Sequence, residues 1–207
     1  MEYFLEDDGR APFTEWLLNL RDRDAHARIS ARLNRVKLGN FGIIKALGDG
    51  VIELKIDYGP GYRVYYAMNG KTIVLLLIGG DKATQTKDIK VAKAYWGATT
   101  ERIMDMARKT GNYDEYHLEW LKDPQNAAAF INAVIEDSDR EAFLLALKDV
   151  VQAQGGMTAI AEKTHVSRSS LYKTLSKRGN PEFNSISKLL HSMGLRLTVE
   201  PAMNVVA

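Results

Sequence analysis

Residues 51–80 read VIELKIDYGPGYRVYYAMNGKTIVLLLIGG, and this stretch predicts three consecutive β-strands, at 51–56, 62–68 and 72–78. All three runs are rich in β-branched, aromatic or other apolar residues, and the first two also alternate apolar and polar positions. Gly59–Gly61 and Asn69-Gly70 supply the turns, and Asn-Gly is among the strongest hairpin signals. We therefore expect an antiparallel sheet in the first half of the chain.

Helical periodicity surrounds these strands. Apolar residues recur at helix spacing from Pro12 to about Leu38, with an interruption near Arg23–Asp24 that predicts a two-helix hairpin. Another helix is expected from about Thr84 to Trp96, and Met1–Leu5 is typical of a short strand. The first half is thus expected to be an α+β domain, with an antiparallel sheet and its helices packed on one side.

The second half changes to an all-helical pattern, which predicts a domain boundary near residue 100. We expect a first domain at 1–97, a linker at 98–112 and a helical domain at 113–207. The sequence Leu195–Val199 is a candidate terminal strand. The expected helices span Tyr113–Leu121, Pro124–Ile135, Arg140–Gln154, Met157–Thr164, Ser167–Ser176 and Phe183–Met193.

Charge is distributed unevenly along the 207 residues, although the net charge is only +2. Residues 28–93 hold 12 basic and 5 acidic side chains, whereas residues 113–141 hold 8 acidic and 2 basic ones. This layout favours a basic segment that meets polyanions and an acidic segment that could cover it. Cysteine is absent, which excludes disulfides. Without a signal-peptide pattern or an apolar run of membrane length, the chain is expected to be cytoplasmic, with no membrane contact.

Residues 155–199 read GGMTAIAEKTHVSRSSLYKTLSKRGNPEFNSISKLLHSMGLRLTV and have the pattern of two helices around a short turn. Ala161 is small enough for close helix crossing, His165-Val166 forms the turn, and Ser167 is a good N-cap for the second helix. Leu171 and Leu175 then face the core at i and i+4.

This stretch resembles the helix-turn-helix of HigA-like antitoxin repressors in the lambda-repressor group. The resemblance implies binding to operator DNA and autorepression, with the second helix in the major groove. Because one helix-turn-helix reads few base pairs, we expect a homodimer through the C-terminal domain, with Leu195–Val199 pairing across its axis. The residues expected to contact DNA are Ser167, Arg168, Ser169, Ser170, Tyr172 and Lys173.

Residues 11–96 resemble the HigB-like branch of the RelE/ParE toxin superfamily, and GPGYRVYY at 59–66 and LLIGGDK at 76–82 carry most of the similarity. The resemblance implies an mRNA interferase that cleaves transcripts on the ribosome and inhibits translation, without a metal or other cofactor. Two alternatives remain open. ParE-like relatives act on a protein target, gyrase, and a degenerate toxin domain could persist only as part of a repressor.

Basic side chains would bind the scissile phosphate and stabilise the charge that develops on it. Lys55, Arg63 and Lys82 stand where the functional basic residues of the superfamily fall. Arg63 is the strongest candidate, because a guanidinium can bind a phosphate through two parallel hydrogen bonds. Glu53 is a candidate base, although a structural ion pair with Lys55 or Arg63 is an equal alternative. Residues 83–88, ATQTKD, lack the tyrosine or histidine that some relatives use after this lysine.

Residues 113–135, YDEYHLEWLKDPQNAAAFINAVI, resemble the toxin-binding N-terminal part of HigA-like antitoxins. Tyr113, Tyr116, Trp120 and Leu121 form an aromatic and apolar stripe at helix spacing. This stripe either belongs to the core of the second domain or docks on the basic first domain. The acidic surplus around it favours docking, so the two parts of the chain are expected to bind each other.

Overall fold

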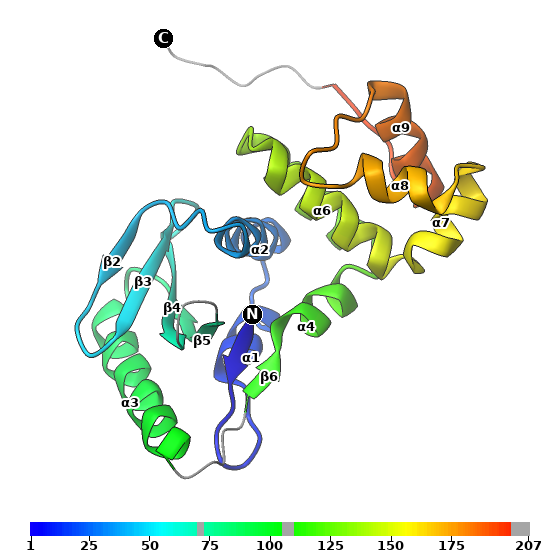
Figure 1. The fold of residues 1–207 in the computed structure, drawn as a ribbon. Coiled ribbons are helices and arrows are strands. Elements are labelled where there is room, and N and C mark those ends of the chain that lie inside the picture. Colours follow the sequence, from blue (N-terminus) through cyan, green and yellow to red (C-terminus); the bar gives the residue numbers. More distant parts are fainter. Residues whose placement is uncertain (70–72, 105–109, 200–207) are drawn as a thin grey trace.

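The computed structural model of the chain describes residues 1–69, 73–104 and 110–199. The first part, which we call the α/β region, is a sheet with helices and includes β6; the helical region is α4 to α9 (Figure 1). The α/β region contains β1 (Glu2–Phe4), α1 (Pro12–Leu18), α2 (Arg23–Lys37), β2 (Ile44–Ala46), β3 (Val51–Ile56), β4 (Tyr62–Asn69), β5 (Ile73–Gly80), α3 (Gln85–Met104) and β6 (Thr110–Asn112). The helical region contains α4 (Tyr113–Trp120), α5 (Pro124–Glu136), α6 (Arg140–Ala153), α7 (Gly156–Thr164), α8 (Arg168–Thr174) and α9 (Phe183–Ser192).

The sheet is mixed, with strand order β2-β3-β4-β5-β1-β6. The expectation of an antiparallel sheet is wrong for one pair, because β1 runs parallel to β5, with Glu2 opposite Leu75. Hydrophobic alternation fixes the face of a residue and leaves the direction of a distant neighbouring strand undetermined. The strands β2 and β6 were not anticipated, since three residues are too few to show a period of two.

Helices cover both faces of the sheet, which corrects the expectation of helices on one side. Even-numbered residues of β3 and β4, such as Leu54 and Val64, pack against α1 and α2. Odd-numbered residues such as Val51, Tyr65 and Ala67 pack with Ala92 and its neighbours on α3. The physical reason is that β4 and β5 carry apolar side chains on both faces, so each face needs cover.

The chain between the two regions is largely structured where it is described. Residues 98–104 continue α3, and Thr110–Asn112 form β6 beside β1, on the segment expected to be a linker. Residues 105–109 lie outside the described residues. Leu195–Val199 are in no strand of this single chain, and their pairing across the axis of a homodimer stays a prediction. Among the described helices, none is long and apolar enough to cross a membrane.

Candidate functional site

The predicted catalytic residues Glu53 and Arg63 meet on the face of the sheet that α3 covers. The Arg63 Nε lies 3.6 Å from Glu53 Oε2, and Gln85 Nε2 of α3 donates a hydrogen bond of 2.8 Å to the same oxygen. Arg63 also donates from a terminal nitrogen to the Gly61 carbonyl at 2.7 Å. Both charged residues are buried, at 6% and 7% exposure. The Arg63 guanidinium can therefore bind a phosphate only if the first turn of α3 or the Glu53 side chain moves.

A second carboxyl group, that of Asp88, gave no signal in the sequence, and it interacts electrostatically with Tyr65, as Glu53 and Arg63 do. Asp88 is buried, and the Thr84 hydroxyl donates to its Oδ2 at 2.5 Å. Burial raises the pKa of Asp88 above its ordinary value. A Cβ at Gly80 would come within 2.0 Å of the same oxygen, so a side chain at that position would displace the Asp88 carboxyl group. Burial and the carboxylates of Glu53 and Asp88 also raise the pKa of Tyr65.

The two lysines of the predicted site are accessible. Lys55 projects from the same face of β3 as Glu53, and its Nζ contacts Asp57 Oδ1 at 2.5 Å with the lysine side chain 42% exposed. Lys82 is exposed on the loop between β5 and α3. The structure thus joins Glu53 to Arg63 and leaves Lys55 and Lys82 as the cations that solvent reaches.

The predicted DNA-contacting residues lie on one short helix and its cap. Ser167 is the N-cap of α8 and accepts a hydrogen bond from the Ser170 amide at 3.1 Å, as expected from its position. His165 ends α7 in the left-handed conformation, at φ 54°, which turns the chain sharply into α8. Leu171 is buried and Leu175 follows it into the same core.

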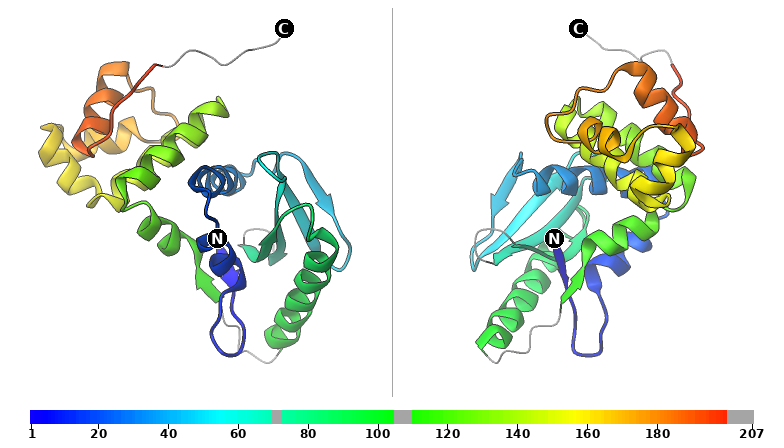
Figure 2. Two further views of the ribbon diagram at one scale, coloured as in Figure 1. Left: turned by 180° about the vertical axis from the view of Figure 1, so that it is seen from behind. Right: turned by 45° about the vertical axis from the view of Figure 1, so that its right-hand side comes forward.

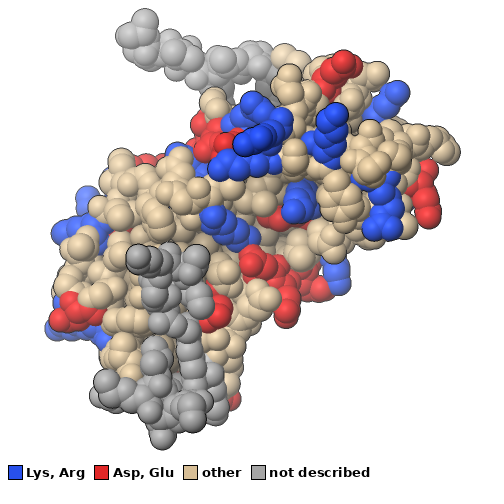
Figure 3. Space-filling view, in the orientation of Figure 1, with Lys and Arg blue, Asp and Glu red and all other residues tan. Residues whose placement is uncertain are grey.

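The other face of α8 is open to solvent. The predicted contact residues Ser167, Arg168, Ser169, Ser170, Tyr172 and Lys173 are all exposed. Figure 3 shows further Lys and Arg side chains over the helical region on the face that includes α8. A short capped helix with an exposed polar and basic face fits a groove lined by phosphates.

The aromatic stripe of α4 is turned toward the α/β region. The Trp120 ring stacks on His26 of α2 with centroids 3.9 Å apart, and Tyr116 lies over the same imidazole at 6.2 Å. Tyr113 is fully buried in the hydrophobic cluster that joins α1 and α2 to the sheet. Leu121 packs instead in the cluster of the helical region. Three of the four predicted contact residues therefore touch the α/β region through their rings.

Ion pairs surround this aromatic contact. Arg28 meets Glu136 at 2.6 Å and Arg35 meets Asp137 at 3.2 Å, which joins α2 to the end of α5. Lys37 contacts Asp114 of α4 at 2.5 Å. Glu136 and Asp137 lie at the negative end of the α5 dipole, where carboxylates are locally unfavourable, so the arginines of α2 offset that cost. Along the inner side, Ala27 and Ala31 of α2 let α5 approach closely.

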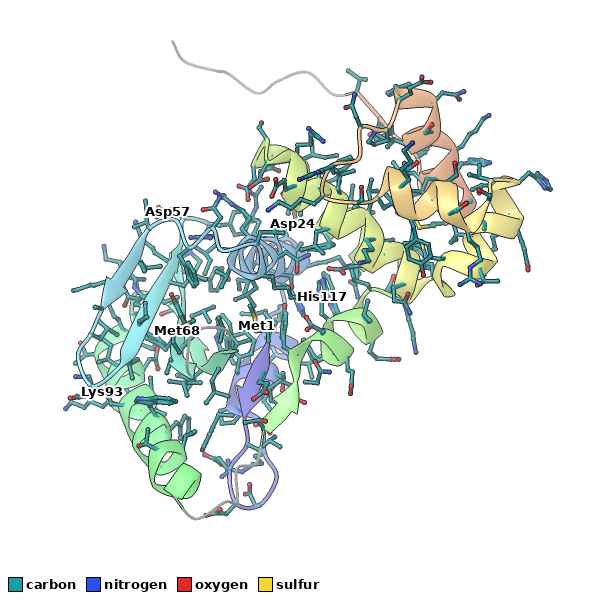
Figure 4. The ribbon with its side chains drawn as sticks, viewed as in Figure 1. Met1, Asp24, Asp57, Met68, Lys93 and His117 are labelled. Atoms are coloured by element: carbon teal, nitrogen blue, oxygen red, sulfur yellow. The ribbon has the colours of Figure 1, made fainter. Side chains whose placement is uncertain are left out.

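Two histidines are buried between the regions, and sequence reasoning gave no signal for them. His117 of α4 is 1% exposed, and its Nε2 lies 3.9 Å from Asp149 Oδ2, which accepts a hydrogen bond from Asn34 at 2.8 Å. Figure 4 shows His117 between α4 and α2. Burial lowers the pKa of both His117 and His26 to about 3, so both are neutral at pH 7.

The inter-region contact and the Glu53–Arg63 pair lie on opposite sides of the sheet. The helical region packs on α2, which covers the face of even-numbered strand residues, and Figure 2 shows this arrangement from behind. Glu53 and Arg63 face α3. The helical region therefore does not cover the predicted catalytic face, which α3 of the α/β region covers instead.

Comparison with known proteins gives two family matches, which correspond roughly to the α/β region and the helical region. Residues 15–97 match the family described as phage-derived protein Gp49-like, and residues 112–201 match the family described as probable addiction module antidote protein. An uncharacterized protein of Haemophilus influenzae is 53% identical over 81 residues, which are 39% of this chain and 82% of that protein. A second uncharacterized protein of this organism is 32% identical over 82 residues, 40% of this chain and 84% of that protein. No solved structure matches the chain.

The two family matches cover separate segments and name complementary halves of one kind of system. A Gp49-like segment is toxin-related, and an addiction module antidote is its counterpart. The chain therefore belongs to the same family as these Haemophilus influenzae proteins, and its Gp49-like and antidote segments identify it as a toxin–antitoxin module.

Proposed function

We propose that this chain is a type II toxin–antitoxin module of the HigB and HigA kind, in which the helical region neutralises the α/β region by docking on α2. The contact between α4 and α2 carries this proposal: three stacked aromatic rings surrounded by ion pairs join the two family segments. Aromatic anchors inside a ring of complementary charge are typical of specific protein interfaces. The toxin part would span residues 1–97 and the antidote part residues 113–207.

We propose that the α/β region is a metal-independent mRNA interferase that acts on ribosome-bound transcripts. The exposed Lys55 and Lys82 would bind the phosphates of the RNA. Arg63 would reach the scissile phosphate after leaving Glu53, and Glu53 would then be free to act as a base. The buried Glu53–Arg63 pair equally supports the alternative of a repressor that retains an inactive toxin region, because in this arrangement the guanidinium is covered.

Removal of the two exposed lysines decides between these candidates. We expect Trp120→Ala, which loosens the docking, to release ribosome-dependent mRNA cleavage, and Lys55→Ala with Lys82→Ala to lower that cleavage at least about 100-fold in the same background. Cleavage is measured by primer extension on transcripts in a translation extract. Lys90→Ala, an exposed lysine of α3, is the matched control. Cleavage that survives loss of both lysines would contradict this assignment, and no cleavage in any folded variant would favour the inactive toxin.

We further propose that the helical region is an autorepressor that binds operator DNA through α8 as a homodimer. Arg168→Ala and Lys173→Ala are each expected to weaken binding to the upstream DNA of the gene about tenfold, because each removes a base or phosphate contact. Gel-shift titration at several salt concentrations measures this, and Lys173→Ala should also lower the salt slope by about one. Lys188→Ala, on the exposed side of α9, should change neither value. Light scattering of the DNA complex tests the homodimer, and a single copy on the operator would refute it.

A further inference from the structure

The last strand of the sheet lies at the boundary between the two family segments. β6 pairs antiparallel with β1, with Tyr3 opposite Gly111 and Phe4 opposite Thr110. The ladder continues where the Tyr113 amide donates to the Met1 carbonyl at 3.2 Å. The antidote family match begins at residue 112, inside this strand. The edge of β1 is thus closed by Thr110 and Gly111, which lie between the two family matches, and by Asn112 and Tyr113, which belong to the antidote match.

Gly111 leaves room for the ring of Tyr3 in this pairing. A Cβ at Gly111 would lie 2.1 Å from ring atoms of Tyr3, because the tyrosine ring crosses directly over the glycine. Distances this short cannot be relieved without moving either the strand or the ring. A side chain at the position opposite Tyr3 would therefore displace the tyrosine ring from the strand.

Tyr113, two residues later, is an anchor inside the α/β region. Its side chain is fully buried among residues of α1, α2 and the sheet, and its ring meets Phe13 edge-on at 6.0 Å. The Tyr113 hydroxyl lies 3.3 Å from the Ser30 hydroxyl of α2, and the Lys37 ammonium lies 5.5 Å above the ring. The core of the α/β region is therefore completed by a side chain of the antidote segment.

Asp114 follows Gly111 and Tyr113 and forms an ion pair with the α/β region. Its Oδ1 lies 2.5 Å from Lys37 Nζ, and this lysine lowers the pKa of the carboxyl although burial opposes the shift. An added strand, a small residue at a crossing point, a buried aromatic anchor and a paired carboxylate together form a peptide-recognition site. The site therefore selects an extended peptide with the sequence pattern Gly-x-Tyr-Asp.

We propose that the edge of β1, with the pocket formed by Phe13, Ser30 and Lys37, is a docking site for an extended Gly-x-Tyr-Asp peptide, and that an antidote segment supplied by another molecule can occupy it. Residues 111–114 fill the site within this chain. The inference rests on the proposed antidote role of the helical region and gives that role a defined point of attachment. The site is remote from Glu53 and Arg63, so its occupant acts on the toxin without covering the catalytic face.

Peptide exchange in the full chain tests this site. Gly111→Val with Tyr113→Ala should vacate it, and a fluorescein-labelled peptide of residues 110–122 should then bind at least tenfold more tightly than it binds the unaltered chain, whose site is occupied. Fluorescence anisotropy measures the affinity. A peptide with Tyr113→Ala should bind about 100-fold more weakly, because it lacks the buried ring. A peptide with Tyr113→Phe should bind about fivefold more weakly, because it lacks the hydrogen bond to Ser30. Glu119→Ala in the peptide, at an exposed position, is the matched control.

A milder chain variant, Gly111→Ala, repeats the test with Tyr113 retained, and near-ultraviolet circular dichroism shows whether each variant is folded. Equal binding of the native and Tyr113→Ala peptides, or no binding to either folded variant, would overturn the proposal. Loss of folding in both variants would also overturn it, because residues 111–114 would then be inseparable core. Binding is measured without RNA, so a failure of the nuclease assignment leaves this result readable by itself.

Discussion

Arg63→Ala is expected to lower the free energy of unfolding by about 3–5 kcal/mol, since it leaves the Glu53 carboxylate buried without its partner. Lys55→Ala, on the same sheet face but with an exposed ion pair to Asp57, should cost less than about 1 kcal/mol. Urea unfolding followed by tryptophan fluorescence measures both values. A loss below about 1 kcal/mol for Arg63→Ala would contradict the buried pair.

The double variant Arg63→Met with Glu53→Gln separates charge from packing. It removes both charges and keeps most of the volume, so it should recover much of the stability that Arg63→Ala loses. Lost activity in Arg63→Ala would reflect unfolding as well as chemistry, so Lys55 and Lys82 are the better probes of the proposed site.

Acid is expected to separate or unfold the two regions. The buried His26 and His117 have pKa values lowered to about 3, whereas a solvent-exposed histidine titrates near 6.5. The separated state therefore binds more protons below pH 6.5, so the contact is at full strength above that pH and weakens as the pH falls toward 3. At pH 5 each histidine lowers the free energy that holds the two regions together by up to about 2 kcal/mol. Lys37, Asp114 and Asp149 also face His117, and burial raises the pKa of Asp149, which offsets part of the loss.

Thermal unfolding between pH 7.5 and 5 measures this effect. His117→Leu keeps the site apolar and removes one titrating group, so its stability should fall less steeply with acid than that of the unaltered chain. The slope against pH is the quantity compared, which makes the result independent of any change in stability at pH 7.5. Stability that stays constant from pH 7.5 to 5 would contradict the burial of neutral histidines at this contact.

The sequence was sufficient for the strands and helices that are long enough to show a period. It located β3, β4 and the capped helix α8, because alternation and the Ser167 cap are local signals. It did not locate β6 or the direction of β1, since a three-residue strand is held by its neighbours rather than by its own pattern. Tertiary packing decides such elements.

In the candidate sites too, local sequence signals were sufficient for some features, and tertiary packing decided the others. The burial of Glu53 and Arg63 depends on α3, whose cover of that sheet face no local pattern indicates. Asp88 follows Thr84 in the first turn of α3, where an acidic residue is favourable even when exposed, so its burial gave no signal. Likewise, the stripe of Tyr113, Tyr116 and Trp120 fitted either an internal core or a docking face. Only the position of α2 distinguishes these two readings.

Growth of bacteria after induction of the full chain is the most direct test of neutralisation by docking. The comparison is between the unaltered chain, the chain with Tyr116→Ala and Trp120→Ala, and Phe183→Ala as a control at an exposed aromatic residue of α9. Loss of the two rings that stack on His26 should weaken docking, so this variant alone should arrest growth and degrade transcripts. Equal arrest by the unaltered chain, or normal growth of the double variant when it is folded and its regions are separated, would contradict the account.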